Sequence, residues 1–219
     1  GDAYLGGGWK TILVGSGGAG TRSIFALDVT NPADFDTVAT GKTKVLWEFT
    51  DTDLGYPINQ FLQPVIGRMQ NGDWAVVFGN GYESTNQRAF LYVVNLETGA
   101  LIKKIDTGVG SAGSPNGLAG PVLLADDNRT ITYAYAGDLR GNLWKFDLTG
   151  GVGSWDSAFK DGATSKPLFQ ARYVSGGVEV PRRGHAERPE PALVLPRHRV
   201  ARKGPVSYTH LTLPTNREV

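Results

Sequence analysis

The stretch Tyr133-Ala-Tyr-Ala-Gly-Asp-Leu-Arg-Gly-Asn-Leu-Trp-Lys-Phe-Asp147 says most about the fold of this 219-residue chain. Its two ends are rich in aromatic and aliphatic residues, which favour β-strands. Between them lies Gly-Asp-Leu-Arg-Gly, and glycine and aspartate are typical of tight turns. The stretch therefore predicts two short strands joined by a turn, with Asp147 beginning the next turn.

The same strand-and-turn unit occurs twice more, earlier in the chain. The glycines that anchor the copies, Gly15, Gly79 and Gly137, are about 60 residues apart, which leaves room for about four short strands in each copy. Lead-in strands are also expected at 63–66 and 120–124. The other strands are expected at 11–15, 24–28 and 45–49, then 75–79, 91–95 and 101–105, then 133–137, 143–147 and 167–169.

These repeats predict an all-β fold, a partial β-propeller of about three four-stranded antiparallel blades of the quinoprotein-like kind. A single four-stranded sheet leaves both faces open, whereas blades stacked around an axis cover one another. We place the blades at about 9–49, 63–105 and 120–170, within a domain of residues 1–180. The layers between the blades are expected to hold aromatic side chains of matched strands, namely Phe25, Trp47, Tyr92, Trp144 and Phe169.

The composition fits short strands and excludes several classes of site. Glycine (30 residues) and proline (12 residues) are abundant, as many turns require. Cysteine is absent, which excludes disulfides, thiolate metal sites and a cysteine nucleophile. No apolar run approaches the roughly 20 residues of a membrane-spanning helix, so no membrane span is expected. Because the repeats begin abruptly, we expect the chain to be part of a longer protein.

The last segment, 181–219, differs from the rest of the chain. It holds all three histidines, excess positive charge and many prolines, and it shows neither strand alternation nor a helical stripe. Residues 181–205 have the composition of a GC-rich gene translated out of frame, and 206–219 look like a translated sequencing adaptor. We interpret the segment as a non-native, unstructured tail; the alternative is an ordinary disordered tail. On both interpretations it predicts no nucleic-acid partner.

Five segments resemble the PilY family of type IV pilus tip-associated proteins. They are Trp9–Gly15, Ile24–Thr30, Val45–Asp51, Phe78–Gly81 and, above all, Tyr133–Asp147, and the resemblance covers about 9–171. It implies the C-terminal propeller of a large secreted protein at or near the pilus tip. It also implies roles in pilus assembly and retraction, twitching motility and surface adhesion, with minor pilins and host or abiotic surfaces as partners. The localisation implied is extracytoplasmic: periplasm, outer membrane or cell surface.

The run Gly15-Ser-Gly-Gly-Ala-Gly20 satisfies the glycine pattern of dinucleotide-binding loops. That role needs a helix directly after the loop, with its N-terminus at the pyrophosphate. Here Ile24–Val29 has the pattern of a strand and Asn31-Pro32 ends it. We therefore interpret the run as a glycine-rich hairpin turn and expect no bound nucleotide.

A degenerate calcium loop is the one candidate metal site. The alternating positions that relatives of the family use for calcium correspond here to Leu124, Asp126, Asn128, Thr130 and Thr132. Leucine replaces the opening carboxylate and threonine the closing one, whereas calcium prefers six to eight oxygen ligands. Only Asp126, Asn128 and Thr130 remain as candidate ligands. We expect no cofactor and a plain turn here, with weak calcium binding as the alternative.

Two other features are interpreted as structural or solvated. Asp51 and Asp53 could hold a metal or act as an acid–base pair, but they lack a third ligand nearby and follow a predicted strand, so we expect a solvated loop. Tryptophans can stack on carbohydrate, but most of those present lie in or beside repeat strands, where blade packing explains them. Trp155, in a glycine- and serine-rich loop, is the one expected to be exposed.

No catalytic set is found in the sequence. There is no histidine before residue 185, no cysteine and no G-x-S-x-G motif. We therefore predict a structural or interaction protein of the pilus rather than an enzyme. Two alternatives stay open: a fragment of a quinoprotein-type dehydrogenase, and a propeller that binds a ligand or sugar. The quinoprotein-like repeat does not decide between them, because a fold does not carry a function by itself.

Overall fold

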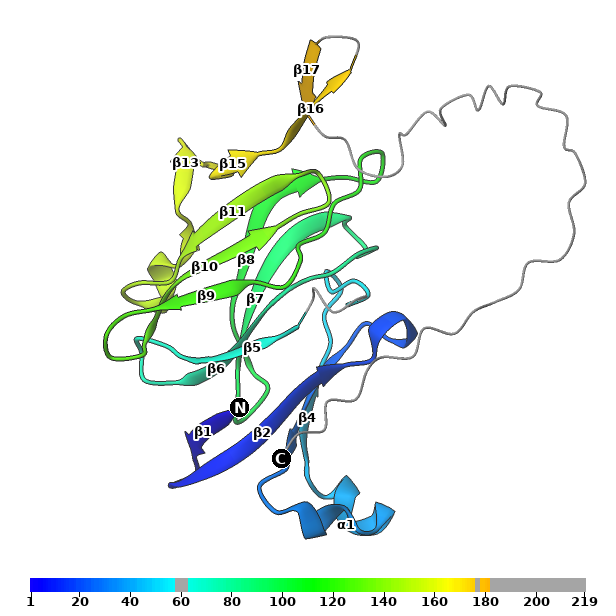
Figure 1. The fold of residues 1–219 in the computed structure, drawn as a ribbon, viewed down its shortest axis with the longest axis vertical. Helices are drawn as coiled ribbons and strands as arrows, with labels where there is room; N and C mark the ends of the chain where they lie inside the picture. The colour runs from blue at the N-terminus through cyan, green and yellow to red at the C-terminus, as the bar shows by residue number, and fades with distance from the viewer. Residues whose placement is uncertain (58–62, 176–177, 182–219) are drawn as a thin grey trace, which may run out of the picture. The chain divides into compact units, whose positions relative to one another are not determined.

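Three antiparallel β-sheets follow one another along the chain in the computed structural model, which describes residues 1–57, 63–175 and 178–181 (Figure 1). The first two sheets have four strands in chain order, and this confirms the predicted fold class. The strands of the first sheet are β1 (Asp2–Leu5), β2 (Gly8–Ser16), β3 (Ile24–Asp28) and β4 (Val45–Phe49); those of the second are β5 (Val65–Arg68), β6 (Trp74–Gly79), β7 (Arg88–Asn95) and β8 (Leu101–Gly110).

The third sheet has the same core and a different outer edge. It is built from β9 (Val122–Ala125), β10 (Ile131–Gly137), β11 (Asn142–Asp147) and β12 (Asp156–Ser157). The expected outer strand at 167–169 is instead a two-residue strand, β15 (Phe169–Gln170), which pairs with Asn142 and Leu143 at one end of β11. The short strand β12 pairs with the other end of β11. Two short strands therefore share the edge that a single strand occupies in the second sheet.

The strand register corrects one equivalence drawn from the sequence. Gly79 pairs with Leu91 and Gly137 pairs with Leu143, as the matched copies predict. In the first sheet the corresponding pair is Ser16 with Ile24, one residue beyond Gly15. The first sheet also begins at β1, upstream of the expected start at residue 9. A one-residue shift matters because it moves each side chain to the opposite face of a strand.

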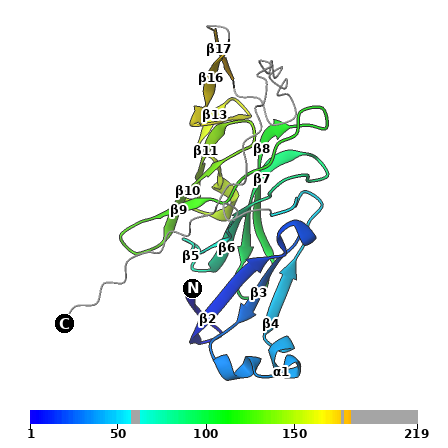
Figure 2. The same ribbon diagram turned by 45° about the vertical axis from the view of Figure 1, so that its right-hand side comes forward.

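Two apolar layers join the three sheets, with the second sheet in the middle. One layer combines first-sheet residues such as Ile12 and Trp47 with the second-sheet residues Phe78 and Tyr92. The other combines the opposite face of the second sheet with the third sheet, including the fully buried Trp144. Figure 2 shows the sheets in this succession. Each sheet thus covers the next, as expected of consecutive propeller blades.

Close backbone approach explains the glycine at the end of β6. A Cβ atom built on Gly79 would lie 2.4 Å from the carbonyl oxygen of Leu118 and 2.1 Å from that of Ala119, in the connection to the third sheet. No side chain fits at such distances, so this position requires glycine. Across the first junction, the indole N–H of Trp47 donates to the carbonyl oxygen of Leu96 at 2.8 Å. Contacts to backbone carbonyl groups therefore join successive sheets, in addition to the apolar packing between them.

The remaining elements of the described chain are short. They comprise the 3-10 turns η1 (Gly18–Gly20), η2 (Pro32–Phe35) and η4 (Val152–Ser154), the one-turn helix α1 (Val38–Lys42), and the hairpins of β13 (Phe159–Asp161) with β14 (Thr164–Lys166) and of β16 (Arg172–Ser175) with β17 (Val178–Pro181). The glycine-rich run ends in η1, and β3 begins four residues later and pairs antiparallel with β2, as the hairpin interpretation predicts. No helix in the described part of the chain is long and apolar enough to span a membrane.

Two tryptophans differ from the sequence-based expectation. Trp155 is fully buried in the layer between the second and third sheets, and its indole N–H donates to the carbonyl oxygen of Gly150 at 3.2 Å. Trp9 is the exposed one, at 67%. Phe169, expected in a layer, is 61% exposed because β15 lies at the edge of its sheet. The tail prediction falls on residues that, after Pro181, lie outside the described part of the chain.

Candidate functional site

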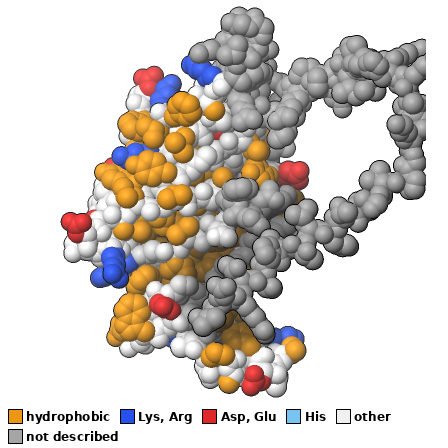
Figure 3. Space-filling view, in the orientation of Figure 1, with side chains coloured by type: hydrophobic (Ala, Val, Ile, Leu, Met, Phe, Trp, Pro, Cys, Tyr) orange, Lys and Arg blue, Asp and Glu red, His pale blue; other side chains and the backbone are white. Residues whose placement is uncertain are grey.

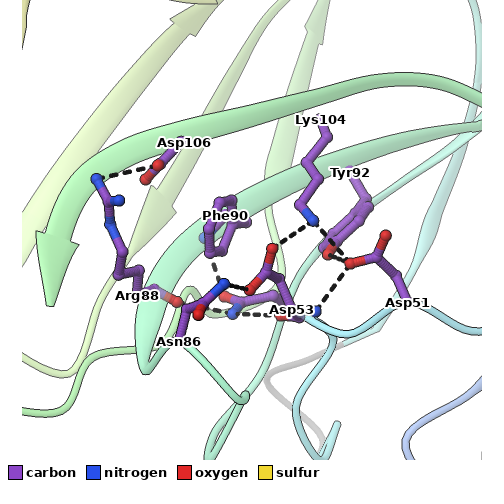
Figure 4. A network of polar contacts seen from close by, with 9 residues as sticks. Asp51, Asp53, Asn86, Arg88, Phe90, Tyr92, Lys104 and Asp106 are labelled. Atoms are coloured by element: carbon purple, nitrogen blue, oxygen red, sulfur yellow. Dashed lines mark hydrogen bonds and ion pairs between the residues drawn. The ribbon is translucent and has the colours of Figure 1, made fainter. Parts of the chain in front are cut away.

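A polar network joins the loop that follows β4 to the second sheet (Figure 4). One carboxylate oxygen of Asp51 accepts hydrogen bonds from the Tyr92 hydroxyl at 2.7 Å, from the Lys104 ammonium at 2.7 Å and from the Asp53 N–H at 2.8 Å. Asp53 accepts a second bond from Lys104, at 2.5 Å, and one from the Asn86 amide. The two aspartates predicted to lie in a solvated loop are therefore tied to strands β7 and β8, which corrects that interpretation.

The lysine of this network is held by aromatic rings as well as by carboxylates. The Lys104 ammonium lies 5.0 Å from the ring centroid of Phe90 and 5.4 Å from that of Tyr92. A cation over an aromatic face is attracted by the electron-rich ring. The ammonium thus occupies the place between Asp51 and Asp53 that a metal ion would need. The pair of aspartates is complete without a metal.

Contacts within the network shift the pKa values of Asp51, Lys104 and Tyr92. Burial would raise the pKa of Asp51, but hydrogen bonds from Lys104, the Asp53 N–H and Tyr92 bring it below its ordinary value. Burial would lower the pKa of Lys104, and the two carboxylates raise it above its ordinary value instead. Burial, and then the hydrogen bond to Asp51, raise the pKa of Tyr92 well above 10. All three shifts move the pKa values further from pH 7, whereas acid–base catalysis needs a pKa near the working pH.

Asn80, fully buried next to this network, connects the second sheet to the loops on both of its sides. Its amide nitrogen donates to the carbonyl oxygens of Asp53 at 3.0 Å and Arg88 at 2.8 Å. Its amide oxygen accepts from the N–H groups of Phe90 and Leu118, both at 3.0 Å. A buried side chain with four satisfied bonds rigidifies its surroundings. In the sequence, Asn80 stood out only as part of the segment Phe78–Gly81 that resembles the PilY family.

Asp138 has the corresponding place in the third sheet and explains the stretch 133–147. Its carboxylate accepts hydrogen bonds from the Asn116 and Asn142 amides and from the Trp144 indole, each at 2.9 Å, and from the N–H groups of Arg140 and Asn142. It therefore closes the β10–β11 turn, orients a core tryptophan and holds the connection from the second sheet. The residues that stood out in the sequence serve the packing of the blade.

The candidate calcium residues lie together in the β9–β10 turn. One oxygen of the Asp126 carboxylate accepts from the N–H groups of Asn128, at 3.0 Å, and Thr130, at 2.8 Å. Arg129 takes a positive φ of 61°, as a tight turn allows. No group of three or more His, Cys, Asp or Glu side chains in the described part of the chain is arranged to hold a metal ion. That calcium binds weakly or not at all at this turn stays a prediction.

The sheets stack face to face in chain order, and polar residues form hydrogen bonds with the segments that connect them. This arrangement defines a segment of a β-propeller. The family model of the PilY1 beta-propeller domain matches residues 2–185, and the chain belongs to this family. It is 46% identical to a type IV pilus biogenesis factor PilY1 homolog of Xylella fastidiosa, over 82% of this chain and 13% of that protein. It is 45% identical to the type IV pilus biogenesis factor PilY1 of Pseudomonas aeruginosa PAO1, over 78% of this chain and 14% of that protein.

A solved structure agrees with this assignment. The crystal structure of the Pseudomonas aeruginosa PilY1 C-terminal domain matches with a TM-score of 0.65 and 42% sequence identity. The match covers 78% of this chain and 36% of that domain. The chain therefore spans about a third of the solved domain and a much smaller share of the curated relatives.

Proposed function

We propose that the protein containing this propeller segment supports type IV pilus biogenesis from outside the cytoplasm. The observation that carries the proposal is the family match over residues 2–185, together with about 45% identity to proteins named type IV pilus biogenesis factors. The resemblance further implies roles in retraction, twitching motility and adhesion. Its partners would then be minor pilins and host or abiotic surfaces.

The segment acts in this proposal by contact and display, and it performs no turnover. The carboxylates that could serve chemistry, Asp51 and Asp53, are bound to Lys104, Tyr92 and Asn86. The lowered pKa of Asp51 and the raised pKa of Lys104 favour an ion pair between these two residues. These contacts support a structural role for the acidic pair over the dehydrogenase alternative.

The test is an in-frame deletion of the parent gene in its host, with complementation by wild type, Trp144→Ala and Trp9→Ala. Trp144 is fully buried between two sheets, while Trp9 is 67% exposed, so the two variants remove the same side chain from opposite environments. We expect the deletion to reduce surface pili, twitching and attachment, Trp144→Ala to fail to restore them, and Trp9→Ala to restore them. Normal piliation and motility in the deletion, with quinone-dependent dye reduction by the full-length protein, would establish the enzyme alternative instead.

A further inference from the structure

Each sheet presents one face to the sheet that follows it, and on the two middle strands of the first two sheets the described residues of this face are aliphatic. In the first sheet, pairing places Ile12, Ile24 and Ala26 on this face, and all three are buried. In the second sheet the matched residues are Ala75, Val77, Leu91 and Val93, which are fully buried under the third sheet. The repeat therefore defines which positions contact a following blade.

No further sheet of four strands follows the third one in the described part of the chain, and the matched face of the third sheet has a different chemistry. Pairing aligns Val122 with Tyr135 and Lys145, and Leu124 with Tyr133. Val122 is 71% exposed and Leu124 is 50% exposed. Figure 3 shows hydrophobic side chains gathered on the side of the molecule where Figure 1 draws β9, β10 and β11. Two tyrosines and a lysine thus lie where the earlier sheets carry aliphatic residues.

The charge of Lys145 determines what kind of group can cover this face. Its ammonium lies 3.9 Å from the ring centroid of Tyr133 and 5.9 Å from that of Tyr135. Among the described residues it forms no ion pair. Lys104 also lies over two aromatic rings, at the first junction, and there a neighbouring loop brings it two carboxylates. Covering Lys145 without an anion would leave a buried charge unpaired, which is strongly unfavourable.

In a β-propeller the next blade covers such a face; we propose that in the parent protein this next blade places a carboxylate against Lys145, so that charge as well as apolar packing specifies the junction. The occupant follows from the repeat, in which the same positions of the two earlier sheets are covered by the next blade. The match covers only 36% of the length of the solved Pseudomonas aeruginosa domain. That domain therefore contains more than the equivalent of these three sheets. The carboxylate follows from the charge of Lys145 and from the precedent of Lys104.

The interface is tested by cysteine labelling of the full-length parent protein, with maleimide modification quantified at each site by peptide mass spectrometry. Val122→Cys probes the face, and Val38→Cys on α1 is the matched control, since the two valines are 71% and 73% exposed in this segment. We expect the Val122→Cys site to react at least about tenfold more slowly, because labelling then requires the blades to open. Equal rates would overturn the proposal. Protection that disappears on dilution would overturn it in favour of a second copy of the protein.

The carboxylate is tested by comparing Lys145→Glu with Lys145→Met in the same full-length protein. Charge reversal against an acidic partner is expected to lower the melting temperature more than neutralisation does. Lys42→Glu, at an exposed position of α1, is the control and is expected to leave the melting temperature nearly unchanged. Equal effects of the Glu and Met variants would exclude an opposing carboxylate. If Lys145→Glu fails to fold, protection of the Val122→Cys site in the Lys145→Met background still decides whether the face is covered.

Discussion

Replacing Asp51 by alanine tests whether the polar network stabilises the junction between the first two sheets. The substitution removes the acceptor of three hydrogen bonds, from Tyr92, Lys104 and the Asp53 N–H. Lys104 keeps its second carboxylate, Asp53, so its charge is not left without a partner. Tyr92 has no other acceptor for its hydroxyl among the hydrogen bonds of the described residues, and the residue is fully buried. The lost Tyr92 bond therefore dominates the expected effect.

The size of the effect can be worked out from these contacts. An unsatisfied buried hydroxyl costs about 1–3 kcal/mol. The partly exposed Lys104 contact adds about 1 kcal/mol or less, because solvent screens the pair. We therefore expect Asp51→Ala to lower the free energy of unfolding by about 1–4 kcal/mol. If Asp51 lay in a solvated loop, the substitution would instead change the free energy of unfolding by less than about 0.5 kcal/mol.

The assay is urea unfolding at pH 7, followed by tryptophan fluorescence. Asp161→Ala is the matched control, because this aspartate is 82% exposed and lies 3.7 Å from Lys166. The control should change stability by less than about 0.5 kcal/mol. A double-mutant cycle of Asp51→Ala with Tyr92→Phe should show a coupling of about 1 kcal/mol or more, because the two residues share a bond. Additive effects, or an Asp51→Ala protein as stable as wild type, would refute the reasoning.

The same network predicts how stability depends on pH. The pKa of Asp51 is lower in the folded protein than its ordinary value of 3.8, so its contribution is present above about pH 4 and is lost as the pH falls through the folded value. The pKa values of Tyr92 and Lys104 are raised above 10.0 and 10.5, so their contributions are present below pH 10 and are lost at higher pH. Asp51→Asn should flatten the acid limb of a stability–pH curve, and an unchanged limb would contradict this assignment.

Three further predictions concern packing, backbone and metal. Trp144→Ala should cost about 3–5 kcal/mol by urea unfolding because the side chain is fully buried, whereas Trp9→Ala should cost under about 1 kcal/mol. Gly79→Ala should cost about 2 kcal/mol or more because its Cβ meets two carbonyl oxygens, while Gly153→Ala, with nothing within 4 Å, should be nearly neutral. Calorimetric titration should show weak or no calcium binding at the β9–β10 turn; micromolar binding abolished by Asp126→Ala would contradict this.

Local pattern was sufficient to predict the strands, because their determinants lie within a few residues of one another. Aromatic and aliphatic runs beside glycine and aspartate turns located the last residues of β6, β7, β10 and β11, while these strands begin one to three residues earlier than expected. The one-residue offset at Gly15 could not be found this way, since glycine recurs in that turn and only the pairing of Ser16 with Ile24 fixes the register. The two short strands at the outer edge of the third sheet, β12 and β15, could not be predicted for a similar reason. Only the pairing with β11 shows which short segments form this edge.

The role of Asp51 and Asp53 was beyond local pattern for a different reason. Their partners Tyr92 and Lys104 lie 41 and 53 residues away in sequence, and nothing near the aspartates shows that a lysine will lie between them. Trp155 was misjudged because its glycine- and serine-rich loop folds back so that the side chain enters the second apolar layer. In both cases stacking of the blades, which no single repeat encodes, determines the environment.

The two lysines that lie over aromatic rings show where function should be sought in a repeat fold of this kind. Lys104 lies at a junction within the segment and forms ion pairs with both Asp51 and Asp53. Lys145 lies on a similar aromatic platform, and the segment supplies it with no carboxylate among the described residues. On our proposal, the contrast between these two lysines marks the face that carries Lys145 as the surface against which another part of the protein places a carboxylate.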